Sequence, residues 1–139
     1  MVPRPIGWIS TISRDGIGNL APYSQFQNLS YDPPMVMFAA NKRSNGDPKD
    51  TVRNAQDTGE FVWNMATYDQ RDAVNRSSQD YPWGVDEMEK IGLEHLPSRL
   101  VKPLRVASSS ASTDRPRLGL VGISRARKPR LSMTCRSPK

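Results

Sequence analysis

The stretch that decides the fold is Pro3-Arg4-Pro5-Ile6-Gly7-Trp8-Ile9-Ser10-Thr11. From residue 7 onward, bulky and small polar residues alternate, and many of the residue types favour strands. Because successive side chains of a strand point to opposite faces, Trp8 and Ser10 share one face, and Ile9 and Thr11 share the other. The sequence therefore predicts a strand over residues 7–13 with two different faces.

A tight hairpin is predicted directly after this strand. Arg14-Asp15-Gly16 supplies turn residues, and Gly16 tolerates the positive φ that such a turn needs. The return strand is predicted over 19–26, and Pro22 within it indicates a sheet edge or a bulge, because proline has no N–H to donate. Asp15-Gly16 is not a phosphate-binding loop, since the required lysine and Ser/Thr are missing.

Two further strands and a helix are predicted after the hairpin. The apolar run 35–40 is bounded by turn residues and indicates a buried strand. Residues 49–59 predict a short helix, with Asp50 or Thr51 capping its first turn and Gly59 in the left-handed position at its end. Residues 61–65 predict another strand. The expected order is strand, strand, strand, helix, strand.

The pattern is weaker beyond residue 68. Residues 70–77 predict one or two helical turns, and residues 86–91 predict another turn that ends at Gly92. The acidic residues 86, 87 and 89 lack the glycine pattern of a calcium loop, so they are interpreted as a helix face. Residues 100–106 predict the start of a strand, in which Pro103 indicates an edge or a bulge.

Charge and aromatic residues divide the chain into two parts. Residues 1–106 contain 12 Lys and Arg against 13 Asp and Glu, whereas residues 107–139 contain 8 against 1. All ten aromatic residues lie between Trp8 and Trp83. A basic Ser/Arg-rich segment without aromatics cannot offset its ordering entropy by burial. We therefore expect one domain over 1–106 and a disordered tail over 107–139.

Several classes of site are disfavoured by composition. Cys135 is the single cysteine, so no intrachain disulfide or cysteine-based zinc site is expected, and a reducing compartment is the default. No apolar run approaches the length of a membrane span, and we expect a soluble, cytoplasmic protein without a membrane partner. His95 is the single histidine, with no activated nucleophile nearby in sequence. No catalytic residue and no metal ligand is assigned.

Five blocks in order and spacing resemble the flavin reductase-like family, whose fold is the FMN-binding split β-barrel. The resemblance implies a mainly β fold with short helices. The family usually has an element before the first block and further strands after a segment like 100–106, so we expect an incomplete barrel here. The blocks are residues 3–11, 19–26, 30–38, 49–51 and 58–64.

The resemblance also implies an FMN site, and each block has a chemical reason to take part. Hydroxyl groups of Ser10 and Thr11, opposite a helix start with Lys49, can bind a phosphate together with free amides at the positive end of the helix dipole. The family assigns the isoalloxazine and ribityl contacts to the strand 23–26 and to the backbone near residues 8 and 9. The loop 41–43 approaches the phosphate in such proteins. The cofactor-binding residues expected on this basis are Trp8, Ile9, Ser10, Thr11, Tyr23, Ser24, Gln25, Phe26, Asn41, Arg43, Lys49, Asp50 and Thr51.

Each block also has a structural interpretation that needs no ligand. Trp8, Ile9 and Phe26 can be barrel core, as strand aromatics and aliphatics usually are. Residues 49–51 can simply be the start of a helix, and the loop 41–43 can be solvated surface.

By resemblance, the expected function is an FMN-binding oxidoreductase of the flavin reductase type. The flavin carries the electron chemistry and is reduced by NADH or NADPH, and the protein forms a homodimer. The alternatives are a truncated flavin-binding module without turnover, and a nucleic-acid-binding protein that uses the basic run 125–130. The last is disfavoured, because no aromatics interleave the basic residues for base stacking.

Overall fold

A three-stranded antiparallel sheet lies at the centre of the computed structural model, which describes residues 3–32, 35–98, 101–103 and 105–107. Its strand order is β2-β1-β5, formed by β1 (Gly7–Ile12), β2 (Gly18–Tyr23) and β5 (Val62–Asn64). The predicted hairpin is confirmed: β1 pairs with β2, and Gly16 in the turn has φ 84°. The opening stretch of the sequence thus forms the middle strand of the sheet.

Two smaller antiparallel pairs flank the central sheet. β3 (Phe26–Ser30) pairs with β4 (Met35–Phe38), and β6 (His95–Leu96) pairs with β7 (Arg105–Val106). The single return strand predicted over 19–26 is wrong, because the chain bends at residues 24 and 25 between β2 and β3. The physical reason is that β1 begins at Gly7, opposite Tyr23, so the chain beyond Tyr23 has no partner in this ladder. The fold consequently has one strand more before the helix than predicted.

The described helices are short. They are α1 (Asp50–Thr58), the 3-10 turn η1 (Tyr68–Gln70), α2 (Arg71–Arg76) and α3 (Glu87–Ile91). Gly59 and Gly92 end α1 and α3 in the left-handed conformation, as predicted. The prediction that Asp50 or Thr51 caps α1 is wrong. The N-cap is Lys49, which makes no side-chain capping bond, while the Asp50 carboxylate accepts from Arg43 and the Thr51 hydroxyl accepts from Asn19.

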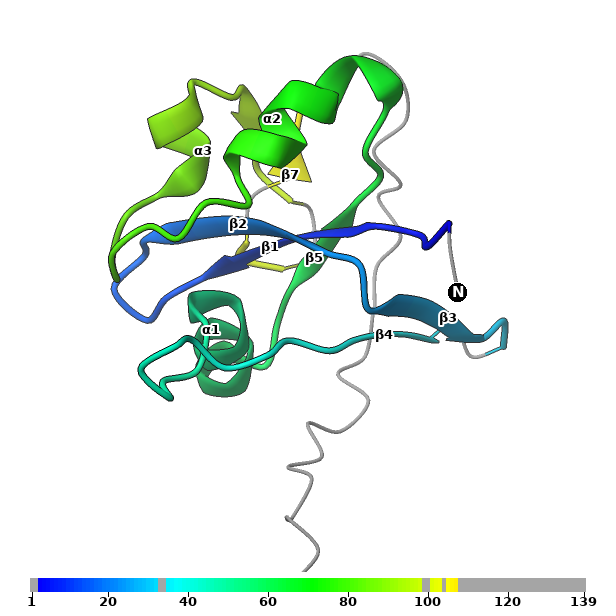
Figure 1. Cartoon of the computed structure of the whole chain (residues 1–139), viewed down its shortest axis with the longest axis horizontal. Helices are drawn as coiled ribbons and strands as arrows, with labels where there is room; N and C mark the ends of the chain where they lie inside the picture. The colour runs from blue at the N-terminus through cyan, green and yellow to red at the C-terminus, as the bar shows by residue number, and fades with distance from the viewer. Residues whose placement is uncertain (1–2, 33–34, 99–100, 104, 108–139) are drawn as a thin grey trace, which may run out of the picture.

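Elements cover both faces of the central sheet (Figure 1). Helices α2 and α3 lie with β7 on one side, and α1 lies with β3 and β4 on the other. The two faces of β1 divide as the alternation predicts. The side of Trp8 packs with Leu20, Met88 and Val106, and the side of Ile9 packs with Tyr23, Phe26, Val36 and Phe61.

The outer edge of β2 is covered by side chains instead of a strand. The N–H of Gly18 donates to Asp86 Oδ2 at 3.1 Å, and the N–H of Leu20 donates to Glu87 Oε2 at 3.0 Å. Pro22 follows in the same phase of the strand and has no N–H, so the edge predicted from it is confirmed. Of the acidic residues predicted to form a helix face, Glu87 and Glu89 lie in α3 and Asp86 is its N-cap. Glu87 is buried, because it satisfies this edge.

Gly18 has no room for a side chain. A Cβ at this position would lie 2.2 Å from Asp86 Oδ2, the atom that accepts the Gly18 N–H. The carboxylate of Asp86 also caps α3 by accepting from the amides of Met88 and Glu89. We expect Gly18→Ala to lower the free energy of unfolding by about 2 kcal/mol, because it displaces a cap and an edge partner together. Urea denaturation measures this, and a loss below about 0.5 kcal/mol, the range of ordinary surface substitutions, would contradict the tight packing at Gly18.

The predicted tail lies outside the described residues, apart from residue 107. The domain boundary at residue 106 therefore stays a prediction, and of the strand predicted over 100–106 only Arg105 and Val106 are described in a strand. Among the residues with a described structure, no helix is long and apolar enough to cross a membrane. In the same part of the chain, no group of three His, Cys, Asp or Glu side chains is arranged to hold a metal ion.

Candidate functional site

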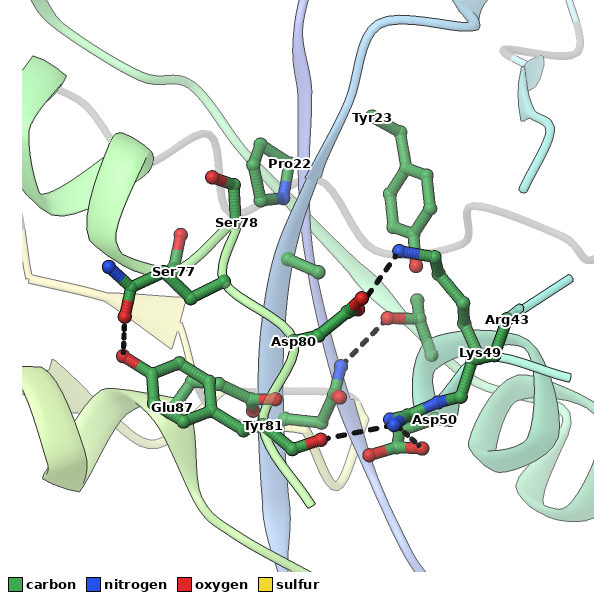
Figure 2. A pocket seen from close by; sticks show the side chains of 14 residues that line it. Pro22, Tyr23, Arg43, Lys49, Asp50, Ser77, Ser78, Asp80, Tyr81 and Glu87 are labelled. Carbon is green, nitrogen blue, oxygen red and sulfur yellow. Dashed lines mark hydrogen bonds and ion pairs between the residues drawn. The ribbon is translucent and has the colours of Figure 1, made fainter. Parts of the chain in front are cut away.

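A hollow open to solvent lies over the outer edge of β2 (Figure 2). One wall comes from β4–α1 loop residues and the first turn of α1, and the other from the segment 77–81 after α2 and from the first residue of α3. Strand β2 forms the floor between these walls. The lining residues are Asn19, Ala21, Pro22, Tyr23, Arg43, Lys49, Asp50, Thr51, Ser77, Ser78, Gln79, Asp80, Tyr81 and Glu87.

The α1 wall supplies positive charge at a helix N-terminus. Lys49 precedes the helix with an extended backbone and leaves the first-turn amides without a side-chain cap. The guanidinium of Arg43 donates to Asp50 Oδ1 at 2.8 Å, next to these amides. Such an arrangement favours an anion, because uncapped amides and the helix dipole both point positive charge outward.

The opposite wall is the segment 77–81, which is tied to the α1 wall by two contacts. Asp80 lies 3.6 Å from the ammonium of Lys49, and the carbonyl of Tyr81 accepts from Arg43 at 3.1 Å. At the start of the segment, the Ser77 hydroxyl accepts from the indole N–H of Trp8 at 2.9 Å. The wall is thus fixed at both ends, and Asp80 itself is a largely exposed carboxylate whose contact with Lys49 is replaceable by a ligand.

Tyr23 carries an unused hydrogen-bond donor in this hollow. Its side chain is 7% exposed, and its hydroxyl makes no hydrogen bond within the described residues. Burial raises the pKa of Tyr23 to about 12, although the neighbouring Thr51 hydroxyl acts in the opposite direction. The group therefore stays protonated near neutral pH. A buried polar atom without a partner is costly, which indicates that a ligand or water completes its bonding.

Two carboxyl groups of the lining have raised pKa values. Burial raises the pKa of Asp50, and the ion pair with Arg43 opposes this rise. Burial raises the pKa of Glu87 to about 7, against the hydrogen bond from Leu20 and with a smaller contribution from the negative charges of Asp50 and Asp86. Near neutral pH the hollow therefore contains a carboxyl group that is only partly ionised.

The raised pKa of Glu87 predicts a pH-dependent stability. Below about pH 4.5 this carboxyl is protonated in both the folded and the unfolded chain, and above about pH 7 it is ionised in both. Between these values the folded state binds more protons than the unfolded state, so the free energy of unfolding falls as the pH rises through this range. We expect the loss to be about 2 kcal/mol, below the roughly 3 kcal/mol of the full shift because the hollow is open to water.

Urea unfolding of the wild-type chain and of Glu87→Gln at pH 5, 6, 7 and 8 measures this effect. The amide is neutral throughout, so the difference in free energy between the two proteins isolates Glu87 from other titrating groups. A difference that stays constant with pH would contradict the raised pKa.

The structure brings together five of the residues expected to bind a cofactor. Tyr23, Arg43, Lys49, Asp50 and Thr51 all line the hollow. Ser10 and Thr11 are fully buried in β1 and do not line the hollow. Thr11 faces α1, where Asn54 donates to its hydroxyl at 3.3 Å, and Ser10 is on the other face of the sheet, where Asn64 donates to its hydroxyl at 3.1 Å. In this structure the two hydroxyls hold neighbouring elements together.

The remaining expected residues lie outside the lining. Trp8 and Ile9 are in the two core clusters, and Phe26 packs beside Trp63 with ring centroids 5.2 Å apart. The side chains of Ser24 and Gln25 are exposed at the bend that follows Tyr23, and Asn41 is exposed in the loop before Arg43. Contacts of these residues with a cofactor stay predictions.

Sequence reasoning missed one whole wall of the hollow. Segment 77–81 and Glu87 are far from the other lining residues in sequence, and nothing in their residue types indicates that they cover β2. Asn19 was seen only as a strand residue, although its side chain donates to Thr51 at 2.8 Å. Pro22 is the one signal in the sequence for this wall. It predicts that β2 is an edge strand, and an edge strand in a folded domain is usually covered by another segment.

Comparison with known proteins identifies the family of this chain. Residues 1–117 match the family model of the flavin reductase like domain. The chain belongs to this family. The resemblance found in the sequence blocks is confirmed, and the domain that contains the hollow belongs to a flavin-binding family.

Solved structures and relatives agree with the flavin reductase-like assignment. Component B of nitrilotriacetate monooxygenase from Bacillus cereus superposes with a TM-score of 0.72 at 29% identity, over 76% of this chain and 52% of that chain. A protein with a split barrel domain from Shewanella frigidimarina superposes with a TM-score of 0.65 at 23% identity, over 74% of this chain and 50% of that chain. The predicted split-barrel fold, mainly strands with short helices, is thereby confirmed.

A curated relative is an uncharacterized protein of Aquifex aeolicus, which is 42% identical over 112 residues. The alignment covers 81% of this chain and 57% of the relative. The flavin reductase-like chain thus spans about half the length of the curated relatives that it matches.

Proposed function

We propose that this flavin reductase-like protein binds FMN in the hollow beside β2 and acts as an oxidoreductase whose flavin is reduced by NADH or NADPH. The observation that carries the proposal is the uncapped N-terminus of α1 with Lys49, beside the unpartnered hydroxyl of Tyr23 in the same hollow (Figure 2). A phosphate needs fixed donors and positive charge, and this wall offers both.

Different lining residues contact different parts of the cofactor in this proposal. Lys49 and the first-turn amides of α1 bind the phosphate, and Thr51 adds a hydroxyl at the same place. Arg43 supplies a second positive charge, held in position by Asp50 and by the carbonyl of Tyr81. Tyr23 donates its hydroxyl to the cofactor, since burial keeps it protonated. When bound, the flavin supplies the electron chemistry, accepting a hydride from the nicotinamide.

The bend after β2 is the expected neighbour of the isoalloxazine. Ser24 and Gln25 are exposed there, immediately beyond Tyr23 of the hollow. The exposed side chains of this bend offer hydrogen-bonding groups without disturbing the sheet, and the buried Phe26 anchors its far end. Residues 24 and 25 therefore contact the ring system while α1 holds the phosphate.

The proposal also includes assembly as a homodimer in the cytoplasm. The hairpin β3–β4 projects from the body of the domain (Figure 1) and exposes apolar side chains. Leu29 is 46% exposed, Met37 is 46% exposed and Tyr31 is 92% exposed. A second copy that covers this hairpin would remove apolar surface from water. Light scattering of the purified chain measures the assembly, and a monomer at micromolar concentration would contradict this part.

Purification followed by ligand titration tests the central proposal. We expect the protein to bind FMN and to gain thermal stability as FMN is added, because a ligand that binds only the folded state stabilises it. A protein that neither binds FMN nor is stabilised by it would overturn the proposal. Anaerobic addition of NADH or NADPH to the loaded protein then bleaches the flavin absorbance if there is turnover. Binding without bleaching would instead favour a flavin-binding module without turnover.

A further inference from the structure

Glu87 is a carboxyl group in the hollow for which phosphate binding has no use. Glu87 is 6% exposed, and its Oε2 accepts a hydrogen bond from the N–H of Leu20 at 3.0 Å. It lines the hollow on the wall opposite Lys49 and Arg43. A buried acid is costly to maintain, and a neutral amide would satisfy Leu20 as well. Its presence in the lining therefore has consequences for what the hollow binds.

The titratable groups around Glu87 come from several elements. Asp86 precedes it at the start of α3, Asp50 lies on α1, and Tyr23 lies on β2. Asp80 lies on the segment 77–81, and Arg43 and Lys49 lie across the hollow. Glu89 and Lys90 of the same helix are exposed and do not line the hollow. The charges that act on the pKa of Glu87, those of Asp50 and Asp86, are thus negative.

The positive charges of the lining are already matched by negative ones. Lys49 is paired with Asp80 at 3.6 Å, and Arg43 is paired with Asp50 at 2.8 Å. With Glu87 protonated the lining is therefore formally neutral, and with Glu87 ionised it carries one net negative charge. This single proton decides whether an incoming anion meets a neutral or a repulsive hollow.

We propose that Glu87 is the specificity-determining residue for ligand charge in this hollow: protonated Glu87 permits a phosphorylated flavin to bind, and ionised Glu87 opposes it while leaving a neutral flavin unaffected. The inference rests on the proposed function, since it concerns the same hollow. It assigns Glu87 a role beyond covering the edge of β2. An edge-covering role alone would not make the affinity depend on the charge of the ligand.

Titration of flavin fluorescence at pH 6 and pH 8 tests the proposal with two ligands. FMN carries the phosphate, and riboflavin lacks it. For the wild-type chain we expect the FMN dissociation constant to rise about tenfold more between these pH values than for Glu87→Gln, which corresponds to about 1.4 kcal/mol. The second ionisation of the phosphate, with a pKa of about 6, is common to both proteins and cancels in the comparison. Riboflavin should show no such difference.

The matched control is Glu89→Gln, which removes a negative charge from an exposed position on the same helix. It should leave the wild-type pH profile unchanged. If wild type and Glu87→Gln have the same FMN profile, or if riboflavin shows the same dependence as FMN, the role of Glu87 is overturned while FMN binding stands. If FMN binds to neither protein at either pH, both this inference and the proposed function fail.

A measurement on the wild-type chain covers the case in which Glu87→Gln does not fold. Coupling between two sites is reciprocal, so a phosphate that disfavours ionised Glu87 must in turn favour its protonated form. Carboxyl carbon NMR should show the pKa of Glu87 rising when FMN binds and not when riboflavin binds. An unchanged pKa in the FMN complex would overturn the proposal.

Discussion

Trp8→Ala is expected to lower the free energy of unfolding by about 4 kcal/mol, the range found for truncating a buried tryptophan. Trp8 is fully buried in the cluster with Leu20, Met88 and Val106, so its removal leaves a cavity under the covering helices. Its indole N–H also donates to Ser77, and this bond fixes the start of one wall of the hollow. Denaturation in urea measures the loss.

Trp8→Phe is the matched variant that keeps most of the ring and removes the N–H. We expect it to cost about 1–2 kcal/mol, because the Ser77 hydroxyl retains its bond to the carbonyl of Val74 at 2.9 Å. A loss below about 1 kcal/mol for Trp8→Ala would contradict the core position of this side chain.

Lys49→Ala combined with Thr51→Ala is expected to weaken FMN binding about 30-fold, or roughly 2 kcal/mol, as charge-assisted hydrogen bonds to a phosphate are removed. Riboflavin has no phosphate to lose these hydrogen bonds, so its affinity should change less than about threefold. Competitive titration with the two flavins measures the ratio of the losses. Equal losses for both ligands would contradict the placement of the phosphate at α1.

Two controls separate this effect from a change of structure. Thr51 accepts a bond from Asn19, so Thr51→Ala alone reports how much of the loss comes from that buried contact. Lys90→Ala removes a positive charge from an exposed position on α3 outside the hollow. We expect Lys90→Ala to change the affinity for FMN less than about twofold, because exposed charges at a distance are screened by salt.

The local parts of the fold could be predicted from the sequence. The alternation of side chains predicts the two faces of β1. The glycine positions predict the hairpin turn and the ends of α1 and α3. These features depend on residues close together in the chain. The bend after Tyr23 could not be predicted, because it results from where β1 begins, and that is a long-range property of the pairing.

The candidate site was predicted in part for the same reason. Lys49, Asp50 and Thr51 form a contiguous block, and a helix start next to a lysine is a recognisable anion site. Glu87 and the segment 77–81 reach the hollow only through the packing of α2 and α3 over β2. The lengths and residue types of α2 and α3 do not indicate which strand these helices cover. The acidic run therefore predicts a helix face, but it does not predict that Glu87 covers β2.

Covering an edge with carboxylates limits how the central sheet can grow. A strand that added to β2 at Gly18 and Leu20, from this chain or from another copy, would have to displace the side chains of Asp86 and Glu87 first. Exposed edges are where folded domains begin to aggregate, and natural sheets protect them with charges and proline. Here two acids and Pro22 occupy successive positions along that edge. The same side chains that border the hollow thus guard the domain against aggregation by strand addition.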